Sequence, residues 1–185
     1  MTGQPDPIKE IQGWIRFRLR SADPSILMLL AHWRRWRGDR IMPDRQDFDP
    51  AAVPRMLKHI AIQQFDPEKD DLRFVLAGEV LNEYWGCSLR GLFLSEILPP
   101  ESFPISLQRW KDLLQVPLVQ YAYVEKTGPD GERVRVAERL ALPFATPGVG
   151  PNLVMTYGLL PDDQPTPARS MPVFESFIRF RTDTI

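Results

Sequence analysis

Cysteine and histidine are scarce in this chain of 185 residues, which has one cysteine, Cys87, and two histidines, His32 and His59. A single cysteine cannot form a disulfide within the chain, and this fits a reducing compartment. The three residues lie on separate predicted elements, whereas the ligands of a zinc site have to converge on one point. The sequence therefore predicts no metal site.

Long apolar runs are also absent. The longest, ILMLLA at 26–31, is far shorter than the ~20 residues that a helix needs to cross a bilayer. The opening segment MTGQPDPIKE lacks the charged and then apolar layout of a signal peptide. We therefore expect a cytoplasmic protein without a membrane partner.

Neither charge sign dominates, because the net charge is −1. The distribution is uneven, with an excess of four positive charges in 1–45 and of five negative charges in the remainder. The arginines of 34–40, with Trp33 and Trp36, are the residue types of a nucleic-acid surface. These tryptophans belong to a predicted apolar helix face, however, so we expect no nucleic-acid partner. The arginines should instead form salt bridges to nearby acidic residues: Asp39, Asp44, Asp47 or Asp49.

Sequence signatures of catalysis are missing. The chain has no nucleophile elbow, no phosphate-binding glycine loop and no pair of metal-binding motifs. Its carboxylates are scattered, and scattered carboxylates do not make a catalytic pair without geometry. We therefore expect that the protein is not an enzyme.

The order of the predicted elements indicates the fold class. Two strand-like runs come first, then helices predicted at 78–86 and 101–115, then three more strand-like runs. This order favours an α+β fold with one five-stranded antiparallel sheet and its helices on one face. The predicted strands are HIAIQQF (59–65), LRFVLA (72–77), LVQYAYVEKT (118–127), RVRVAERLAL (133–142) and LVMTYGLL (153–160).

Two helices are predicted ahead of this sheet. A short amphipathic helix at 8–19 precedes a helix at 24–37, which Asp23 caps and Gly38 ends. The first half of the second helix is apolar on nearly all sides, which indicates burial on more than one side. We expect one side to cover the protein's own body and the other to form a homodimer interface through Leu27, Met28 and Ala31.

The segments that flank the predicted sheet are rich in proline. The segment 38–59 has three prolines and predicts a loop, which Arg45 is expected to anchor. Near the other end, PDDQPTPARS (161–170) predicts a polar linker. The following MPVFESFIRF (171–180) has apolar residues that a disordered tail would not need, so we expect it to dock, as helix or strand, on the body or a partner. These residues are Phe174, Phe177, Ile178 and Phe180.

These features divide the chain into three parts. Residues 1–56 form an N-terminal helical extension and proline-rich loop, residues 57–161 form the central domain, and residues 162–185 form a linker and docking tail.

The central part resembles a PAS domain. In YWGCSLRGLFLSEIL (84–98), a helix ends at Gly86, a short turn reaches Gly91 and an apolar run follows, as in PAS domains. Upstream lie a Trp-rich helix, an Arg-Gly pair, a Pro-x-Arg step and an Asp-Pro corner, a combination that resembles a proteobacterial family of stand-alone PAS-domain proteins. The resemblance implies a PAS-like five-stranded antiparallel sheet whose helices complete a cup. The matching residues are Trp33, Arg37–Gly38, Pro43–Arg45 and Asp49–Pro50.

The resemblance does not name a ligand, because PAS domains bind haem, flavins, small metabolites, partner proteins or nothing. Flavin photosensors of this superfamily carry a reactive cysteine in an Asn-Cys-Arg-Phe-Leu-Gln stretch, and Cys87 lies ahead of that position. Haem-binding members usually use a histidine from the helical side of the cup, whereas His32 and His59 lie outside 79–116. We therefore expect no cofactor.

Aromatic residues are concentrated around the expected cup, and they have two interpretations. They either pack a filled core or line a partly aromatic pocket with polar groups for a small ligand. Glu138 favours the second, because it lies in phase with the apolar residues of its strand, and an inward carboxylate has to be paired or functional. The neighbouring arginines Arg133, Arg135 and Arg139 would face solvent. The candidate ligand-binding residues are Tyr84, Trp85, Trp110, Tyr121, Tyr123, Glu138 and Tyr157.

The sequence therefore predicts a stand-alone sensory or regulatory module that binds a small ligand or a partner protein. Its output would act in trans on an unknown effector protein, because the remaining residues are too few for an output domain. Two alternatives stay open. The protein is either a ligand-free interaction scaffold that uses its C-terminal segment or a sheet edge, or a small-molecule enzyme that uses Glu138 and a tyrosine.

Overall fold

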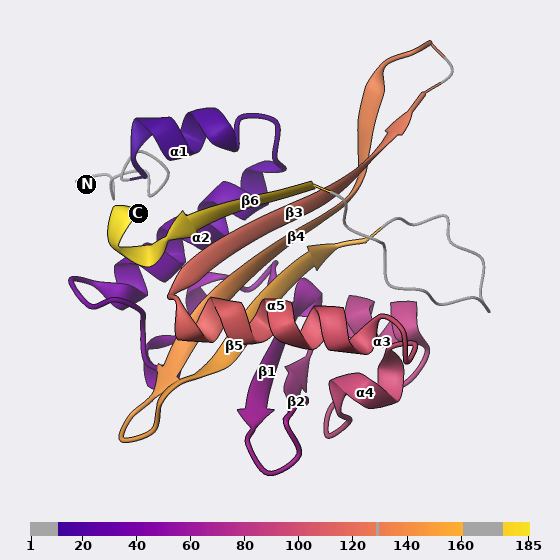
Figure 1. Ribbon diagram of the computed structural model, residues 1–185. Helices are drawn as coiled ribbons and strands as arrows, with labels where there is room; N and C mark the ends of the chain where they lie inside the picture. The colour runs from indigo at the N-terminus through magenta and orange to yellow at the C-terminus, as the bar shows by residue number, and fades with distance from the viewer. Residues whose placement is uncertain (1–10, 129, 161–175) are drawn as a thin grey trace.

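The computed structural model describes residues 11–128, 130–160 and 176–185. Its centre is an antiparallel six-stranded sheet with the strand order β2-β1-β5-β4-β3-β6 (Figure 1). The first five strands confirm the predicted five-stranded sheet, and the C-terminal segment adds the sixth. The strands are β1 (Ile60–Asp66), β2 (Asp71–Ala77), β3 (Leu118–Thr127), β4 (Arg133–Thr146), β5 (Gly150–Leu159) and β6 (Ser176–Arg181).

One face of the sheet is covered by the helices that lie between β2 and β3. These are α3 (Glu79–Trp85), α4 (Leu94–Ile97) and α5 (Phe103–Gln115). The helix α3 ends at Gly86, whose φ of 60° suits a glycine and confirms the predicted helix end. The long α5 crosses this face and buries an apolar stripe against it (Figure 1). The structure therefore confirms that helices cover one face of the predicted sheet.

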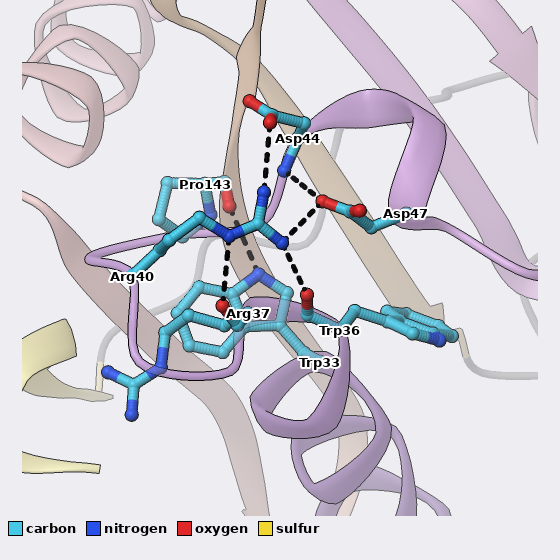
Figure 2. A network of polar contacts seen from close by, with 7 residues as sticks. All are labelled: Trp33, Trp36, Arg37, Arg40, Asp44, Asp47 and Pro143. Carbon is cyan, nitrogen blue, oxygen red and sulfur yellow. Dashed lines mark hydrogen bonds and ion pairs between the residues drawn. The ribbon is translucent and has the colours of Figure 1, made fainter.

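The opposite face is covered by α1 (Gly13–Arg18) and α2 (Pro24–Arg37), so helices lie on both faces of the sheet. The side chain of Asp23 accepts a hydrogen bond from the Ser25 backbone nitrogen at 2.8 Å, and Gly38 ends α2 with a φ of 59°. Both ends of α2 are as predicted. The indole nitrogen of Trp33 donates to the Pro143 carbonyl at 3.0 Å, which joins the middle of α2 to β4 (Figure 2).

The loop after α2 is held by one arginine. The guanidinium of Arg40 pairs with Asp44 at 2.9 Å and with Asp47 at 2.7 Å, and it also donates to the Trp36 carbonyl (Figure 2). These contacts confirm the predicted salt bridges within the arginine cluster. A further backbone bond, from the Ala145 nitrogen to the Pro43 carbonyl at 3.0 Å, ties the loop to the β4–β5 hairpin.

The C-terminal segment docks on the protein's own sheet. The strand β6 pairs with β3 in antiparallel register, with Phe180 opposite Val119. Phe180 is buried and meets the ring of Trp14 from α1, with 5.4 Å between the ring centroids. Arg37 at the end of α2 donates to the backbone oxygens of Thr182 and Ile185. The segment is thus a strand, although Phe174 lies outside the described residues.

We expect Phe180→Ala to destabilise the protein by about 3–5 kcal/mol, because it removes a buried aromatic side chain. Phe180 is only 3% exposed. Urea denaturation measures the change. Val149→Ala is the matched control, since Val149 is 69% exposed and its truncation should cost less than about 0.5 kcal/mol. Equal stability of Phe180→Ala and wild type would show that β6 does not dock.

Candidate functional site

A small cavity lies between the sheet and the helices α3 to α5. Its volume is about 70 Å³, and most of its lining is aliphatic or aromatic. Three polar side chains also line it, and they come from three different strands: Gln63 of β1, Arg139 of β4 and Thr156 of β5. The cavity is therefore an apolar space with a few polar groups on its sheet wall.

Buried polar atoms at this cavity include the side-chain oxygen of Gln63, an acceptor, and the indole nitrogen of Trp110, a donor. Neither has a hydrogen-bond partner among the described residues. Gln63 is 4% exposed and Trp110 is 3% exposed, so bulk water does not reach them freely. A buried polar group without a hydrogen-bond partner lowers the stability of the folded protein by about 1–3 kcal/mol. A small ligand that both donates and accepts a hydrogen bond would satisfy these two atoms.

Arg139 gives the cavity a cationic wall. Its guanidinium carbon lies 4.8 Å from the ring centroid of Trp110, which is a favourable cation–π distance. Burial, followed by the positive charge of Arg109, lowers the pKa of Arg139 to about 9. The side chain therefore stays protonated at neutral pH. Arg139 is therefore not a plain solvent contact as expected from the sequence, because it is partly buried and lies over Trp110 of α5.

The predicted cup residues divide between the two faces of the sheet. Tyr84, Trp85 and Trp110 line the cavity, because α3 and α5 carry them over the sheet. The other four candidates lie on the opposite face, among residues that pack under α2: Tyr121, Tyr123, Glu138 and Tyr157. Alternation along the strands showed that these four share a face, but it could not show which helices cover that face.

Glu138 is buried as predicted, and it is paired. Its carboxylate accepts hydrogen bonds from the Tyr121 hydroxyl at 2.6 Å and from the Asp23 backbone nitrogen at 3.0 Å. Arg135 also donates to the Tyr121 hydroxyl at 2.6 Å, and Tyr157 donates to the hydroxyl of Ser25 at 2.9 Å. These contacts fasten the start of α2 to β3, β4 and β5. Glu138 therefore acts as an anchor for α2 and does not face the cavity.

The residues predicted for a dimer interface are largely covered by the protein's own chain. Ala31 is only 1% exposed, Leu27 packs against the core on the α2 side, and Met28 is partly buried. The apolar character of α2 on nearly all sides is thus explained by burial within one protomer. Homodimerisation stays a prediction, and light scattering at high protein concentration tests it.

Within the part of the chain that the structure describes, no group of three or more histidine, cysteine, aspartate or glutamate residues is placed to hold a metal ion. None of the described helices is long and apolar enough to cross a membrane.

The comparisons with known proteins decide the family. A family model described as a PAS domain matches residues 21–158, which is most of the chain. The chain belongs to the PAS domain family. This confirms the resemblance, and PAS domains in general are sensory or signalling modules that bind ligands or partner proteins. No curated protein sequence matches the chain.

Solved PAS structures are also similar to this chain. One is a variant PAS-B domain of Drosophila melanogaster Cycle with bound glycerol, with 13% identity and a TM-score of 0.38; the match covers 54% of this chain and 95% of that one. Another is an RNA-binding light-oxygen-voltage receptor, with 17% identity and a TM-score of 0.36. That match covers 63% of this chain and 35% of the receptor.

The buried contacts of Tyr121 predict a loss of stability at alkaline pH. Burial, followed by the hydrogen bond to Glu138, raises the pKa of Tyr121 above its ordinary value of about 10. Above that pH the unfolded chain releases a proton that the folded chain keeps, so the free energy of unfolding falls as pH rises. Below it, this contribution is fully present.

We expect Tyr121→Phe to lower the free energy of unfolding by about 1–3 kcal/mol at neutral pH, because Glu138 and Arg135 lose a hydrogen-bond partner. Above about pH 10, the free energy of unfolding of this variant should fall less steeply with pH than that of the wild type. Urea midpoints measured for both proteins at a series of pH values from neutral to alkaline give the two slopes. The same alkaline slope in both proteins would contradict the assignment.

Proposed function

We propose that this PAS domain senses a small, mainly apolar molecule that carries one hydroxyl group, and that the ligand binds in the cavity under α3 to α5. The observation that supports this most directly is the pair of buried atoms on Gln63 and Trp110 that lack partners among the described residues. A hydroxyl group can donate to the Gln63 oxygen and accept from the Trp110 indole nitrogen at the same time.

The size of the cavity limits the ligand. Pockets for drug-sized molecules are about 300–1,000 Å³, whereas this cavity is about 70 Å³. A ligand of a few non-hydrogen atoms fits, and a larger one requires movement of the side chains over the cavity. Trp85 and Tyr84 on the short helix α3 are the side chains that would move, because Leu81 is the only fully buried residue of α3.

The strand β4 supplies a route from the ligand to the rest of the protein. Arg139 faces the cavity, and its neighbour Glu138 binds the start of α2 on the other face. A shift of β4 on ligand binding would therefore change the anchoring of α2. We propose that α2 and the adjoining loop pass this change to an effector protein, with or without a second copy of the chain.

The substitution Gln63→Leu tests the proposed ligand site. Without ligand it should stabilise the protein by about 1–2 kcal/mol, because a buried acceptor that lacks a partner is replaced by an apolar side chain of similar size. It should also weaken the binding of 1-propanol, used as the probe, by about tenfold or more. The Trp110 indole signal in a nitrogen–proton NMR spectrum reports binding, and calorimetry reports stability.

Two controls accompany this experiment. Gln115→Leu changes an exposed glutamine at the end of α5 and should alter neither property. The probe 1-propanethiol has the shape of propanol but is a weak hydrogen-bond donor, so it should bind more weakly than propanol to the wild type. The absence of any change in the Trp110 signal with these probes would remove the proposal.

The small cavity volume favours a second candidate, a ligand-free interaction scaffold. In that case the alcohol probe does not bind, and the Trp110 signal does not change when 1-propanol is added. Binding of the probe therefore separates the two functions.

A further inference from the structure

A second, larger hollow lies on the other face of the sheet. It has a volume of about 490 Å³, and its floor includes Gln64 of β1, Leu76 of β2 and Leu153 of β5. Gln64 pairs with Leu153 in the sheet, and both lie in the same alternation as the residues that face α2. The hollow is thus separate from the cavity under α3 to α5.

Two arginines from different loops line this hollow. Arg45 comes from the loop after α2, and Arg90 comes from the turn after α3. Arg45 is partly buried and lies over the ring of Phe48, with 5.3 Å from its guanidinium carbon to the ring centroid. Within residues 11–128, 130–160 and 176–185, neither arginine forms an ion pair or a side-chain hydrogen bond. The predicted role of Arg45 as an anchor of its loop stays a prediction, and its described contact within that loop is the one with Phe48.

The chain segments that carry the two arginines are held by contacts of neighbouring residues. Arg40 binds Asp44 and Asp47, which lie on either side of Arg45, so the two nearest acidic residues are already paired (Figure 2). On the other side, the Gly91 nitrogen donates to the Phe74 carbonyl at 2.8 Å and fixes the turn that carries Arg90 against β2. The two arginines therefore line one hollow from chain segments that these contacts hold.

The walls of the hollow indicate the chemistry of its occupant. Val75, Leu76 and Leu153 give it an apolar side, and Thr146 and Gln64 add neutral polar groups. Arginine binds carboxylates and phosphates through paired hydrogen bonds, and the volume lies within the range of small-molecule sites. No acidic side chain lines the hollow among the described residues, so an anion would not be repelled there.

We propose that this hollow, the Arg45–Arg90 pocket, binds a small molecule with an anionic carboxylate or phosphate group attached to an apolar body. The anion lies between the two guanidinium groups, and the apolar body lies against Val75, Leu76 and Leu153. This site is independent of the proposed ligand site at Gln63 and Trp110, and each stands if the other fails.

Nitrogen–proton NMR titration of the whole chain tests the pocket. Benzoate and phenyl phosphate are the probes for the two anionic groups, inorganic phosphate is the probe without an apolar body, and benzyl alcohol is the neutral probe. We expect the first two to shift the backbone signals of Leu76 and Thr146, with inorganic phosphate weaker and benzyl alcohol without effect at these signals. The tighter of benzoate and phenyl phosphate identifies the anionic group.

Variants assign the binding to the two arginines. Arg45→Gln and Arg90→Gln should each weaken the binding of the tighter probe by about tenfold, as expected for the loss of a charge-assisted hydrogen bond. Arg45→Lys keeps the charge and should have a smaller effect. The matched control is Arg16→Gln, which changes an exposed arginine of α1. The helix α1 packs against β6, and the pocket lies near β1 and β2 at the other end of the sheet, so this variant should bind the probe as the wild type does.

Three outcomes would overturn the proposal. They are the absence of shifts with both aromatic anions, equal binding by Arg45→Gln, Arg90→Gln and wild type, and equal affinity for inorganic phosphate and the aromatic anions. A thermal unfolding curve for each variant confirms that it is folded, and Arg90→Gln, which changes an exposed residue, decides the result if Arg45→Gln does not fold.

Discussion

The alternation of side chains along β4 is the constraint on which both faces of this protein depend. Glu138 and Arg139 are neighbours in sequence, so an extended strand has to send them to opposite faces of the sheet. Glu138 receives hydrogen bonds from Tyr121 and the start of α2, while Arg139 lies over Trp110 beside the cavity. A slip of one residue would move Glu138 and Arg139 to the opposite faces and away from these partners, so the packing of α2 and α5 fixes the register.

The same geometry gives β1 two roles. Gln63 faces the small cavity under α3 to α5, and its neighbour Gln64 faces the larger Arg45–Arg90 pocket. The first space is small and mainly apolar, with one donor and one acceptor that lack partners among the described residues. The second is open and lined by two cations. We propose that the two spaces bind different ligands, a neutral hydroxyl compound and an anion, although one strand borders both.

Local patterns in the sequence predicted the elements well, because local physics sets them. Asp23 and Gly38 mark the two ends of α2, and Gly86 marks the end of α3. The order of strands and helices predicted one antiparallel sheet. The resemblance to PAS domains, which the family match confirms, rested on short-range features of this kind. At the candidate site, the three aromatic residues of α3 and α5 lie at the cavity, and their role as ligand-binding residues stays a prediction.

The sequence by itself determined which residues share a strand face and where the helices begin and end. Only the tertiary structure decided which face meets which helices, and so placed Tyr121, Tyr123, Glu138 and Tyr157 under α2 and Arg139 at the cavity. It also decided that the C-terminal segment is the strand β6 and that Arg45 and Arg90 line one hollow. The physical reason is that the alternation of side chains along a strand separates two faces without showing which elements cover each face. Burial and charge pairing depend on residues far apart in the chain.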